Sequence, residues 1–248
     1  MEHEAKPLKT VKYMTHPSND FEEVYMRVRE KENRWLSDEL VKQLPFLPSS
    51  HPHCREWKKR ADSLKRIQKK LKKLGKIGNL LEIGCGNGWF AHQLIHCASE
   101  IDAIDIGRNE LEQAARCFQN QQLQFICCDN LSLLDNEKYD IIIFNASLQY
   151  FDLTEILWSI ISKKLTATGK IIVMDSPIYD EQQLAFAQKR THNYFENLNE
   201  SLASSYYKHL TWSKLPQHQV LFKPSIFGKL FNFTQSPFPI LEISKNYI

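Results

Sequence analysis

Between residues 80 and 176, short apolar segments alternate regularly with segments of helical periodicity. The apolar segments have the length of strands and read "LLEI", "IDAIDI", "LQFICC", "YDIIIFNA" and "KIIVMDS". Between them, "NELEQAARCFQ" places Leu111, Ala114, Ala115 and Phe118 on one helical face. Strands that alternate with helices predict an α/β fold, with a mostly parallel sheet, right-handed crossovers and helices on both faces. In such a sheet, ligands bind beyond the carboxyl ends of the strands.

The regular pattern divides the chain into four parts. Residues 1–54 are mixed and broken by prolines, which predicts a helical and irregular N-terminal segment. Residues 55–176 form the predicted core. Residues 177–235 lose the alternation, and we expect them to form a cap or insertion over the carboxyl edge of the sheet. Within 236–248, "ILEIS" is predicted to be a terminal strand that completes the sheet.

Composition is that of an ordinary soluble globular protein, with 42% hydrophobic and 25% charged residues. No apolar run reaches the length of a membrane helix, and the first ten residues lack the apolar centre of a signal peptide. The six cysteines include no CxxC pair, so we expect reduced thiols, no metal site and a cytoplasmic location.

The basic residues are concentrated in one segment. Residues 55–76 hold 11 of the 32 Lys and Arg residues but only 2 of the 29 acids. The same segment repeats apolar residues at helical spacing: Trp57, Ala61, Leu64, Ile67, Leu71 and Leu74. We therefore predict a helix packed on the core with a solvated basic face. Binding of nucleic acid through that face is the less favoured alternative.

A glycine-rich turn follows the first strand of the core, in "LLEIGCGNGWFAHQL". A P-loop is excluded because no Lys-Ser/Thr pair follows the glycines. A dinucleotide-binding loop would need glycine where Trp89 stands. The pattern that remains is Glu-x-Gly-x-Gly-x-Gly, from Glu82 to Gly88.

Acidic residues at the ends of two strands, and one just past a third, indicate what that turn binds. Glu82 can accept from an ammonium group, and Asp105, 23 residues later, can accept from two ribose hydroxyls. Asp129 lies where an acid can accept from the adenine amino group, and Asn130 is a second candidate. These residues predict an adenosine ligand that carries an amino acid.

Residues 80–175 resemble the class I S-adenosylmethionine-dependent methyltransferases, in the small-molecule, methyltransferase type 11-like branch. The resemblance rests on "LEIGCGNGWFAHQL", "IDAIDIGRNELEQA", "FICCDN", "YDIIIFNASLQYF" and "LTATGKIIVMDSP". It implies a Rossmann-like seven-stranded sheet with one antiparallel strand, and a methyltransferase that converts S-adenosyl-L-methionine to S-adenosyl-L-homocysteine. The expected cofactor contacts are Glu82, Gly84, Cys85, Gly86, Asn87, Gly88, Asp105, Ile106, Asp129, Asn130, Asn145 and Ala146.

The segment after the fourth strand excludes several classes of methyl acceptor. "NASLQYF" lacks the prolines of amino-methylating DNA enzymes and the paired glutamates of arginine methyltransferases, and the chain lacks the Pro-Cys pair of cytosine-C5 enzymes. We therefore expect a small acceptor, flat or apolar, methylated by in-line transfer. Tyr150, Tyr179 and His192 are candidate substrate contacts. No general base is identified, although His192 is the first residue to test.

Two other functions stay open. One is an RNA or protein methyltransferase that uses the basic helix 55–76, and the other is a non-catalytic S-adenosylmethionine-binding scaffold. The acceptor atom and the oligomeric state do not follow from the residues.

Overall fold

The computed structural model describes residues 9–225 and 235–248. Its helices and strands run in the order β1 Lys12–Tyr13, α1 Asn19–Lys31, α2 Asp38–Val41, α3 Cys54–Leu74, β2 Ile77–Ile83, α4 Trp89–Gln93, β3 Ala98–Asp105, α5 Arg108–Cys117, β4 Leu123–Cys127, β5 Tyr139–Asn145, α6 Glu155–Lys164, β6 Leu165–Met174, β7 Ile178–Tyr179, α7 Glu181–Asn197, α8 Ala203–Tyr206, β8 Leu210–Thr211, β9 Gln219–Phe222 and β10 Ile240–Ser244. Single 3₁₀ turns add η1 Leu131–Leu133, η2 Leu148–Tyr150, η3 Trp212–Lys214 and η4 Lys245–Tyr247.

The central sheet has the order β1-β4-β3-β2-β5-β6-β10-β9. Strands β1 to β6 pair in parallel, whereas β10 is antiparallel to both β6 and β9. The order reverses between β2 and β5, which is where α/β sheets of this kind bind their ligands. The predicted mostly parallel sheet with helices on both faces is confirmed.

The number of strands differs from the predicted seven because β1 adds an eighth at the β4 edge. β1 is only two residues long and exposed, so it has no apolar pattern that could reveal it. Backbone pairing with β4 holds it in place, and the Met14 N–H donates to the Cys127 carbonyl at 3.0 Å just beyond it.

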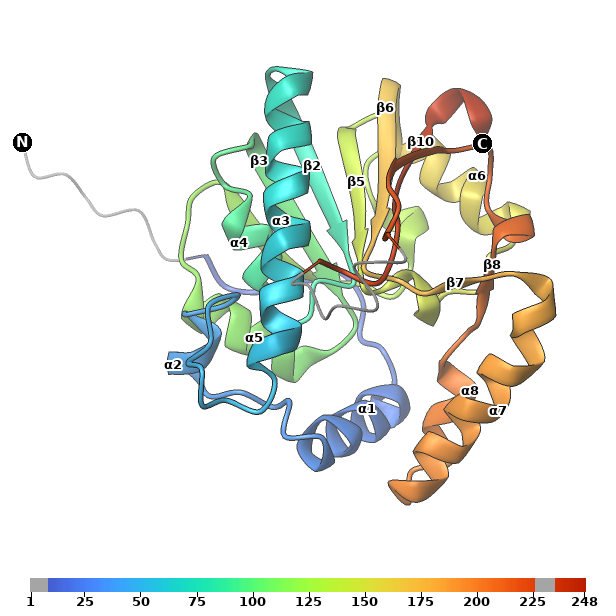
Figure 1. Ribbon diagram of the computed structural model, residues 1–248. Helices are drawn as coiled ribbons and strands as arrows, with labels where there is room; N and C mark the ends of the chain where they lie inside the picture. The colour runs from blue at the N-terminus through green and yellow to red at the C-terminus, as the bar shows by residue number, and fades with distance from the viewer. Residues whose placement is uncertain (1–8, 226–234) are drawn as a thin grey trace, which may run out of the picture.

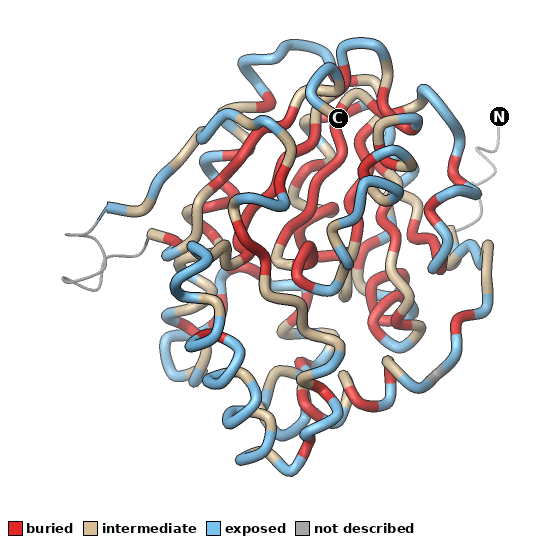
Figure 2. Tube along the Cα trace, turned by 90° about the vertical axis from the view of Figure 1, so that its right-hand side faces the viewer, coloured by how far each residue is buried: buried red, intermediate tan, exposed pale blue. Residues whose placement is uncertain are grey.

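Successive side chains along each strand point alternately into two hydrophobic cores, one on each face of the sheet. Leu80 and Ile143 face α3, α4 and α5, whereas Leu81 and Phe144 face α6. Figure 1 shows these two helix layers, and Figure 2 shows the buried strands between them. Helices cover both faces of the sheet, which explains why the sequence of β5 is apolar almost throughout.

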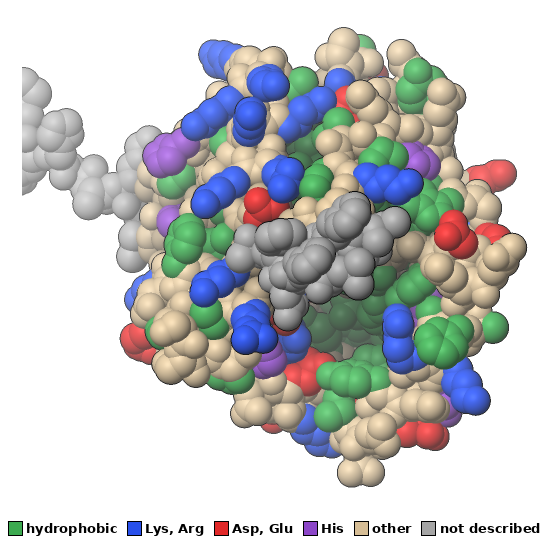
Figure 3. Space-filling view, in the orientation of Figure 1, with side chains coloured by type: hydrophobic (Ala, Val, Ile, Leu, Met, Phe, Trp, Pro, Cys, Tyr) green, Lys and Arg blue, Asp and Glu red, His purple; other side chains and the backbone are tan. Residues whose placement is uncertain are grey.

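The basic helix packs as its apolar stripe predicts. Ala61, Leu64, Ile67 and Leu71 of α3 are buried in the core beneath it, and Leu74 at its end is exposed. Lys and Arg side chains gather on the outer side of α3 in Figure 3.

The region assigned to the cap separates into two parts. α7 and α8 lie beyond the carboxyl ends of the strands, together with α1 (Figure 1). β9, by contrast, belongs to the sheet edge, where Val220 is opposite Leu241 of β10. Its four residues, QVLF, are exposed or half-buried, and Leu221 and Phe222 pack against the core. Residues 226–234 of the predicted cap lie outside the described residues, and β10 occupies the predicted terminal strand.

Among the described residues, no helix is long and apolar enough to cross a membrane.

Candidate active site

The glycine turn joins β2 to α4 in a conformation that side chains would prevent. Gly84, Gly86 and Gly88 have φ angles of +76°, +51° and +72°. A Cβ atom on Gly84 would lie 2.4 Å from the Cβ of Ser147, and one on Gly88 would lie 2.4 Å from the Phe125 ring. The turn therefore needs glycine both for its backbone angles and for its close packing against β4 and the loop after β5.

Asp105, the last residue of β3, connects this turn to the next one. Its Oδ2 atom accepts from the Gly86 N–H at 2.7 Å, and its Oδ1 atom accepts from the N–H groups of Ile106 at 2.7 Å and Gly107 at 2.9 Å. Burial raises the pKa of Asp105, and these three backbone donors oppose the shift. A carboxylate has about four acceptor positions, so one stays available to a ligand.

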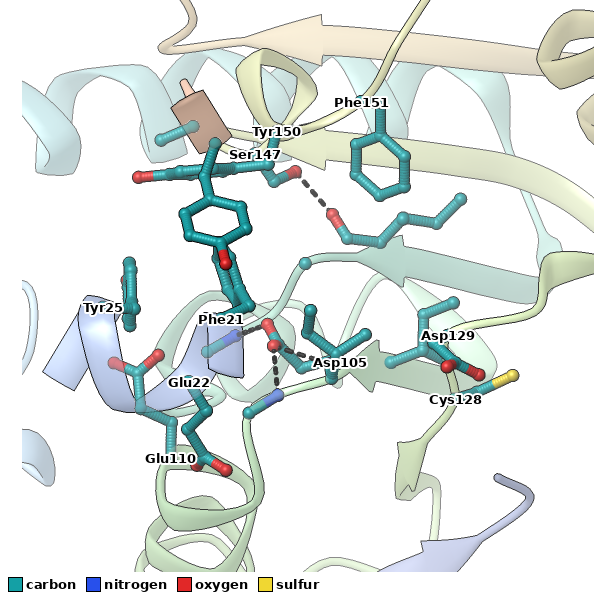
Figure 4. Close-up of a pocket in the computed structure, with 18 of the residues that line it drawn as sticks. Phe21, Glu22, Tyr25, Asp105, Glu110, Cys128, Asp129, Ser147, Tyr150 and Phe151 are labelled. Carbon is teal, nitrogen blue, oxygen red and sulfur yellow. Dashed lines mark hydrogen bonds between the residues drawn. The ribbon is translucent and has the colours of Figure 1, made fainter. Parts of the chain in front are cut away.

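The Asp105 cavity, of 370 Å³, opens beside this carboxylate. Figure 4 shows the Asp105 side chain turned toward the neighbouring loops, with Phe21 and Tyr25 reaching the same cavity from α1. Ile104, Leu131 and Phe151 add apolar walls. Asp129 lies at the exposed rim of this cavity.

The Glu82 cavity, of 340 Å³, lies on the other side of the glycine turn and is more polar. Five buried side-chain atoms that lack a hydrogen-bond partner belong to residues of its wall: Arg29 Nε, Glu82 Oε2, Asn145 Oδ1, Gln149 Oε1 and Asp175 Oδ2. Buried polar groups are normally paired. This concentration is therefore typical of a site that a polar ligand completes.

Glu82 is 1% exposed, and its burial raises its pKa well above the ordinary value. The Asn145 side chain and the Ala91 backbone act in the opposite direction but are outweighed. An ammonium group beside Glu82 would stabilise the charged carboxylate and supply the missing donor.

Backbone strain marks the same cavity. Ala146 and Asp175 follow β5 and β6, and both have positive φ angles, +54° and +51°. Such angles cost a non-glycine residue about 1–2 kcal/mol, and they are often found at functional sites. The Asp175 Oδ1 atom accepts from Ser63 at 2.9 Å and Ser236 at 2.6 Å, which fixes its carboxylate at the cavity wall.

The aromatic cavity, of 320 Å³, lies between α1 and α7–α8. Its aromatic lining consists of Phe21, Tyr25, Tyr150, Tyr194, Phe195, Tyr206 and Tyr207. Tyr25 and Tyr150 line all three cavities, so the three spaces adjoin one another. The hollow below the grey atoms in Figure 3 opens among hydrophobic side chains.

Ion pairs hold α1 against α7–α8, although these helices come from opposite ends of the chain. Glu200, 7% exposed, pairs with Arg27 at 3.1 Å and with Lys31 at 2.8 Å. Val24 and Val28 of α1 pack with Ala203 beneath these pairs. The N-terminal segment and the cap therefore form one cover over the cavities.

Most of the predicted cofactor residues lie at these cavities. Asp105, Ile106 and Asp129 line the Asp105 cavity, and Gly84, Gly86 and Ala146 line both it and the Glu82 cavity. Glu82, Cys85, Asn87 and Asn145 line the Glu82 cavity. Gly88 packs beneath the turn, against Phe125. Asn130 lines none of the three cavities, because its Oδ1 atom caps η1 through Ser132 N at 3.1 Å.

Of the predicted substrate residues, only Tyr150 lies at the cavities. The Tyr179 hydroxyl accepts from Arg190 at 3.2 Å, and Tyr179 lines none of the three spaces. His192 is exposed on α7 and lies 3.2 Å from Glu196, one turn further along. His192 lines none of the three cavities, so the structure does not bring it to the site.

Four further residues at these cavities are not among the predicted contacts. Tyr25 and Arg29 come from α1, outside the quoted motifs, whereas Glu110 of α5 and Gln149 of η2 lie within them. Glu110 directly precedes Leu111 in an amphipathic helix, so its charge suggests a position on the helix surface. In the structure it is only 6% exposed. Its burial raises its pKa to about 7. No local pattern separates these residues from ordinary helix-surface positions.

Residues 74–234 of the chain match a known protein family. A family model described as a methyltransferase domain matches residues 74–234, more than half of the chain. A malonyl-[acyl-carrier protein] O-methyltransferase of Acetivibrio thermocellus is 34% identical over 76 residues, which are 30% of this chain and 27% of the relative. Malonyl-[acyl-carrier protein] O-methyltransferase 1 of Ilyobacter polytropus is 32% identical over 129 residues, 51% of this chain and 43% of the relative. The chain thus covers less than half the length of each relative.

A solved structure of similar fold is geranyl diphosphate C-methyltransferase from Streptomyces coelicolor A3(2), in complex with Mg²⁺, geranyl-S-thiolodiphosphate and S-adenosyl-L-homocysteine. Its TM-score is 0.58 and its identity 12%, over 92% of this chain and 100% of that one. At this identity the likeness concerns the fold alone. From the family match and the architecture together, the chain belongs to the methyltransferase-domain family, with the fold of the class I S-adenosylmethionine-dependent methyltransferases.

Proposed function

We propose that this protein is an S-adenosylmethionine-dependent methyltransferase that acts on a small molecule. The observation that carries the proposal is the cluster of unpartnered buried polar atoms in the Glu82 cavity, directly beside the glycine turn and Asp105. An adenosine that carries an amino acid has ribose hydroxyls that suit the Asp105 cavity and an ammonium group that suits the Glu82 cavity. Bound S-adenosylmethionine supplies a methyl group that is already activated by its sulfonium charge.

The residues of the Asp105 cavity suit the nucleoside part. The free acceptor position of Asp105 can receive a ribose hydroxyl, and Asp129 at the rim can accept from the adenine amino group. In the Glu82 cavity, the oxygens of Glu82 and Asn145 can accept from the ammonium group of the amino acid.

The aromatic cavity supports the choice of a small, flat or apolar acceptor. Its rings pack against one another, with Phe21 and Tyr206 at 5.1 Å and Tyr150 and Tyr207 at 6.1 Å between ring centroids. Aromatic walls favour flat ligands of moderate size. In-line transfer needs alignment and exclusion of water, and the cover of α1 and α7–α8 can supply both.

Titration calorimetry with S-adenosylmethionine and S-adenosylhomocysteine tests the cofactor assignment. Binding of both is expected, and binding of a nicotinamide nucleotide without either would refute the proposal. A metabolite extract incubated with labelled methyl donor then identifies the acceptor by mass spectrometry.

The alternative of an RNA acceptor makes a separate prediction. Affinity for RNA would fall steeply with salt, because contacts between phosphates and the α3 lysines release counterions. Methyl donor bound without transfer to any acceptor would favour the scaffold instead. Cytoplasmic location stays a prediction.

A further inference from the structure

Arg29 stands at the boundary between the Glu82 cavity and the aromatic cavity, and it lines both. Its side chain is 25% exposed, and its Nε atom is buried without a hydrogen-bond partner. The acid nearest to it is Glu110, with 3.8 Å between Arg29 Nη2 and Glu110 Oε1. That distance allows attraction but exceeds a hydrogen bond.

The two other arginines of the Glu82 cavity are paired, which makes Arg29 distinctive. Arg34 donates to both Glu56 oxygens, at 2.8 and 2.6 Å. Arg60 donates to Glu56 Oε1 at 3.1 and 3.2 Å. A guanidinium carries five N–H donors, yet within residues 9–225 and 235–248 no hydrogen bond from the Arg29 guanidinium is observed.

The groups around Arg29 keep it positively charged without neutralising it. Burial opposes the charge, but Tyr25 and Glu110 together keep the pKa of Arg29 above its ordinary value. Glu110 itself has a pKa raised to about 7 by burial, so near neutral pH it carries only part of a negative charge. The Arg29 guanidinium also lies 5.2 Å from the centre of the Tyr25 ring, which holds it in place over the cavity.

We propose that Arg29 is an anion-binding residue that receives a carboxylate from a ligand bound between the two cavities. The planar guanidinium matches a carboxylate through two parallel hydrogen bonds. Such a ligand would also give the unpaired Nε donor its missing acceptor. The proposal rests on the proposed methyltransferase function.

Two ligands could bring this carboxylate. One is the methyl donor, whose amino-acid end belongs beside Glu82 in the same cavity. The other is an acidic acceptor in the aromatic cavity, which Arg29 also lines. The chemistry at Arg29 is the same in both cases, so the experiment must separate the sources.

The first arm compares S-adenosylhomocysteine with 5′-methylthioadenosine, which lacks the amino acid, by titration calorimetry. If the methyl donor supplies the carboxylate, Arg29→Gln weakens binding of S-adenosylhomocysteine by about 10- to 100-fold, the effect of a lost charged hydrogen-bond pair. Binding of 5′-methylthioadenosine stays unchanged. Arg29→Lys retains the charge without the planar donor pair and should recover part of the loss.

The second arm titrates 1-naphthoate and its neutral analogue 1-naphthamide into the complex with S-adenosylhomocysteine. If the acceptor supplies the carboxylate, naphthoate binds more tightly than naphthamide to the wild type, and Arg29→Gln removes this preference. Arg116→Gln is the matched control, because Arg116 is exposed and pairs with Asp38 far from the cavities. Thermal unfolding and circular dichroism establish that each variant is folded.

The outcomes distinguish this inference from the function on which it rests. If neither nucleoside binds the wild type, the proposed function itself fails. Suppose instead that both nucleosides bind. If Arg29→Gln then changes neither the ratio of the affinities for S-adenosylhomocysteine and 5′-methylthioadenosine nor the preference for naphthoate over naphthamide, the anion-binding role of Arg29 is wrong.

Discussion

Asp105 Oδ2 lies 2.7 Å from the backbone nitrogen of Gly86, and this hydrogen bond joins the loop after β3 to the glycine turn after β2. Two residues that are 19 positions apart thereby form one wall of the candidate cofactor site. The carboxylate does two things at once: it holds the turn and keeps an acceptor position for a ligand.

Replacement of this carboxylate should weaken cofactor binding, both directly and by loosening the glycine turn. Asp105→Asn loses the charge, and because both oxygens accept from backbone N–H groups, its amide nitrogen replaces one of these acceptors. We expect S-adenosylhomocysteine to bind about 1–3 kcal/mol more weakly by calorimetry, the scale of a charged hydrogen-bond set. Asp135→Asn, at a side chain that is 78% exposed, is the control and should bind as the wild type does. Equal affinities of the two variants would remove Asp105 from the site.

Alanine at Gly88 should destabilise the protein through both strain and a clash. Its φ angle is +72°, and the new Cβ would meet Phe125 at 2.4 Å. We expect a loss of about 2–4 kcal/mol in the free energy of unfolding, from left-handed strain together with overpacking, measured by urea denaturation. The same substitution made in a Phe125→Leu background isolates the strain, because leucine lacks the ring atoms that the new Cβ would meet. An equal loss in both backgrounds would exclude the clash with Phe125.

Glu110 should make stability depend on pH near neutrality. Burial raises its pKa in the folded protein from 4.5 to about 7, so the folded state binds the proton more tightly than the unfolded state. Its contribution is therefore complete below pH 4.5 and is lost as pH rises through 7. With 1.36 kcal/mol for each pKa unit, the change over the 2.5 units from 4.5 to 7 is at most about 3.4 kcal/mol.

Urea denaturation between pH 5 and 8 measures this effect. Glu110→Gln cannot titrate, so its free energy of unfolding should fall less over this range than that of the wild type. Parallel profiles for the two proteins would show that Glu110 does not titrate in this range.

Removal of Glu200 should loosen the cover of the site. Glu200→Gln loses the charge that attracts Arg27 and Lys31, so α1 should separate from α7–α8 more often. Hydrogen exchange should then become faster in residues 19–31, while the strands of the sheet keep their protection. Glu196→Gln removes an exposed acid of α7 that pairs with His192, and it should leave exchange in α1 unchanged. Unchanged exchange in Glu200→Gln would mean that the apolar contacts alone hold the cover.

The strands β2 to β6 and the glycine turn could be predicted from sequence because both depend on neighbours along the chain. β2 to β6 follow from apolar segments at regular spacing, and Gly84, Gly86 and Gly88 follow from a turn that only glycine can form. Asp105 is the last residue of β3 and Glu82 is the last but one of β2, so the parallel direction of the strands places both acids at the same edge of the sheet. The burial of the α3 stripe follows from helical periodicity in the same way.

Only the tertiary structure decided what surrounds this turn. Arg29 and Glu110 look like ordinary helix-surface residues until packing brings α1 and α5 against the glycine turn. His192 looks like a base but lies on the outer side of α7, because neighbouring helices and not local spacing determine which side of that helix faces the site. β1 has too little apolar pattern to be recognised, and β9 is a four-residue segment whose place in the sheet depends on its pairing with β10. Local sequence determined the strands and the glycine turn, whereas the aromatic cavity depends on contacts between segments more than 100 residues apart, such as Arg27 with Glu200.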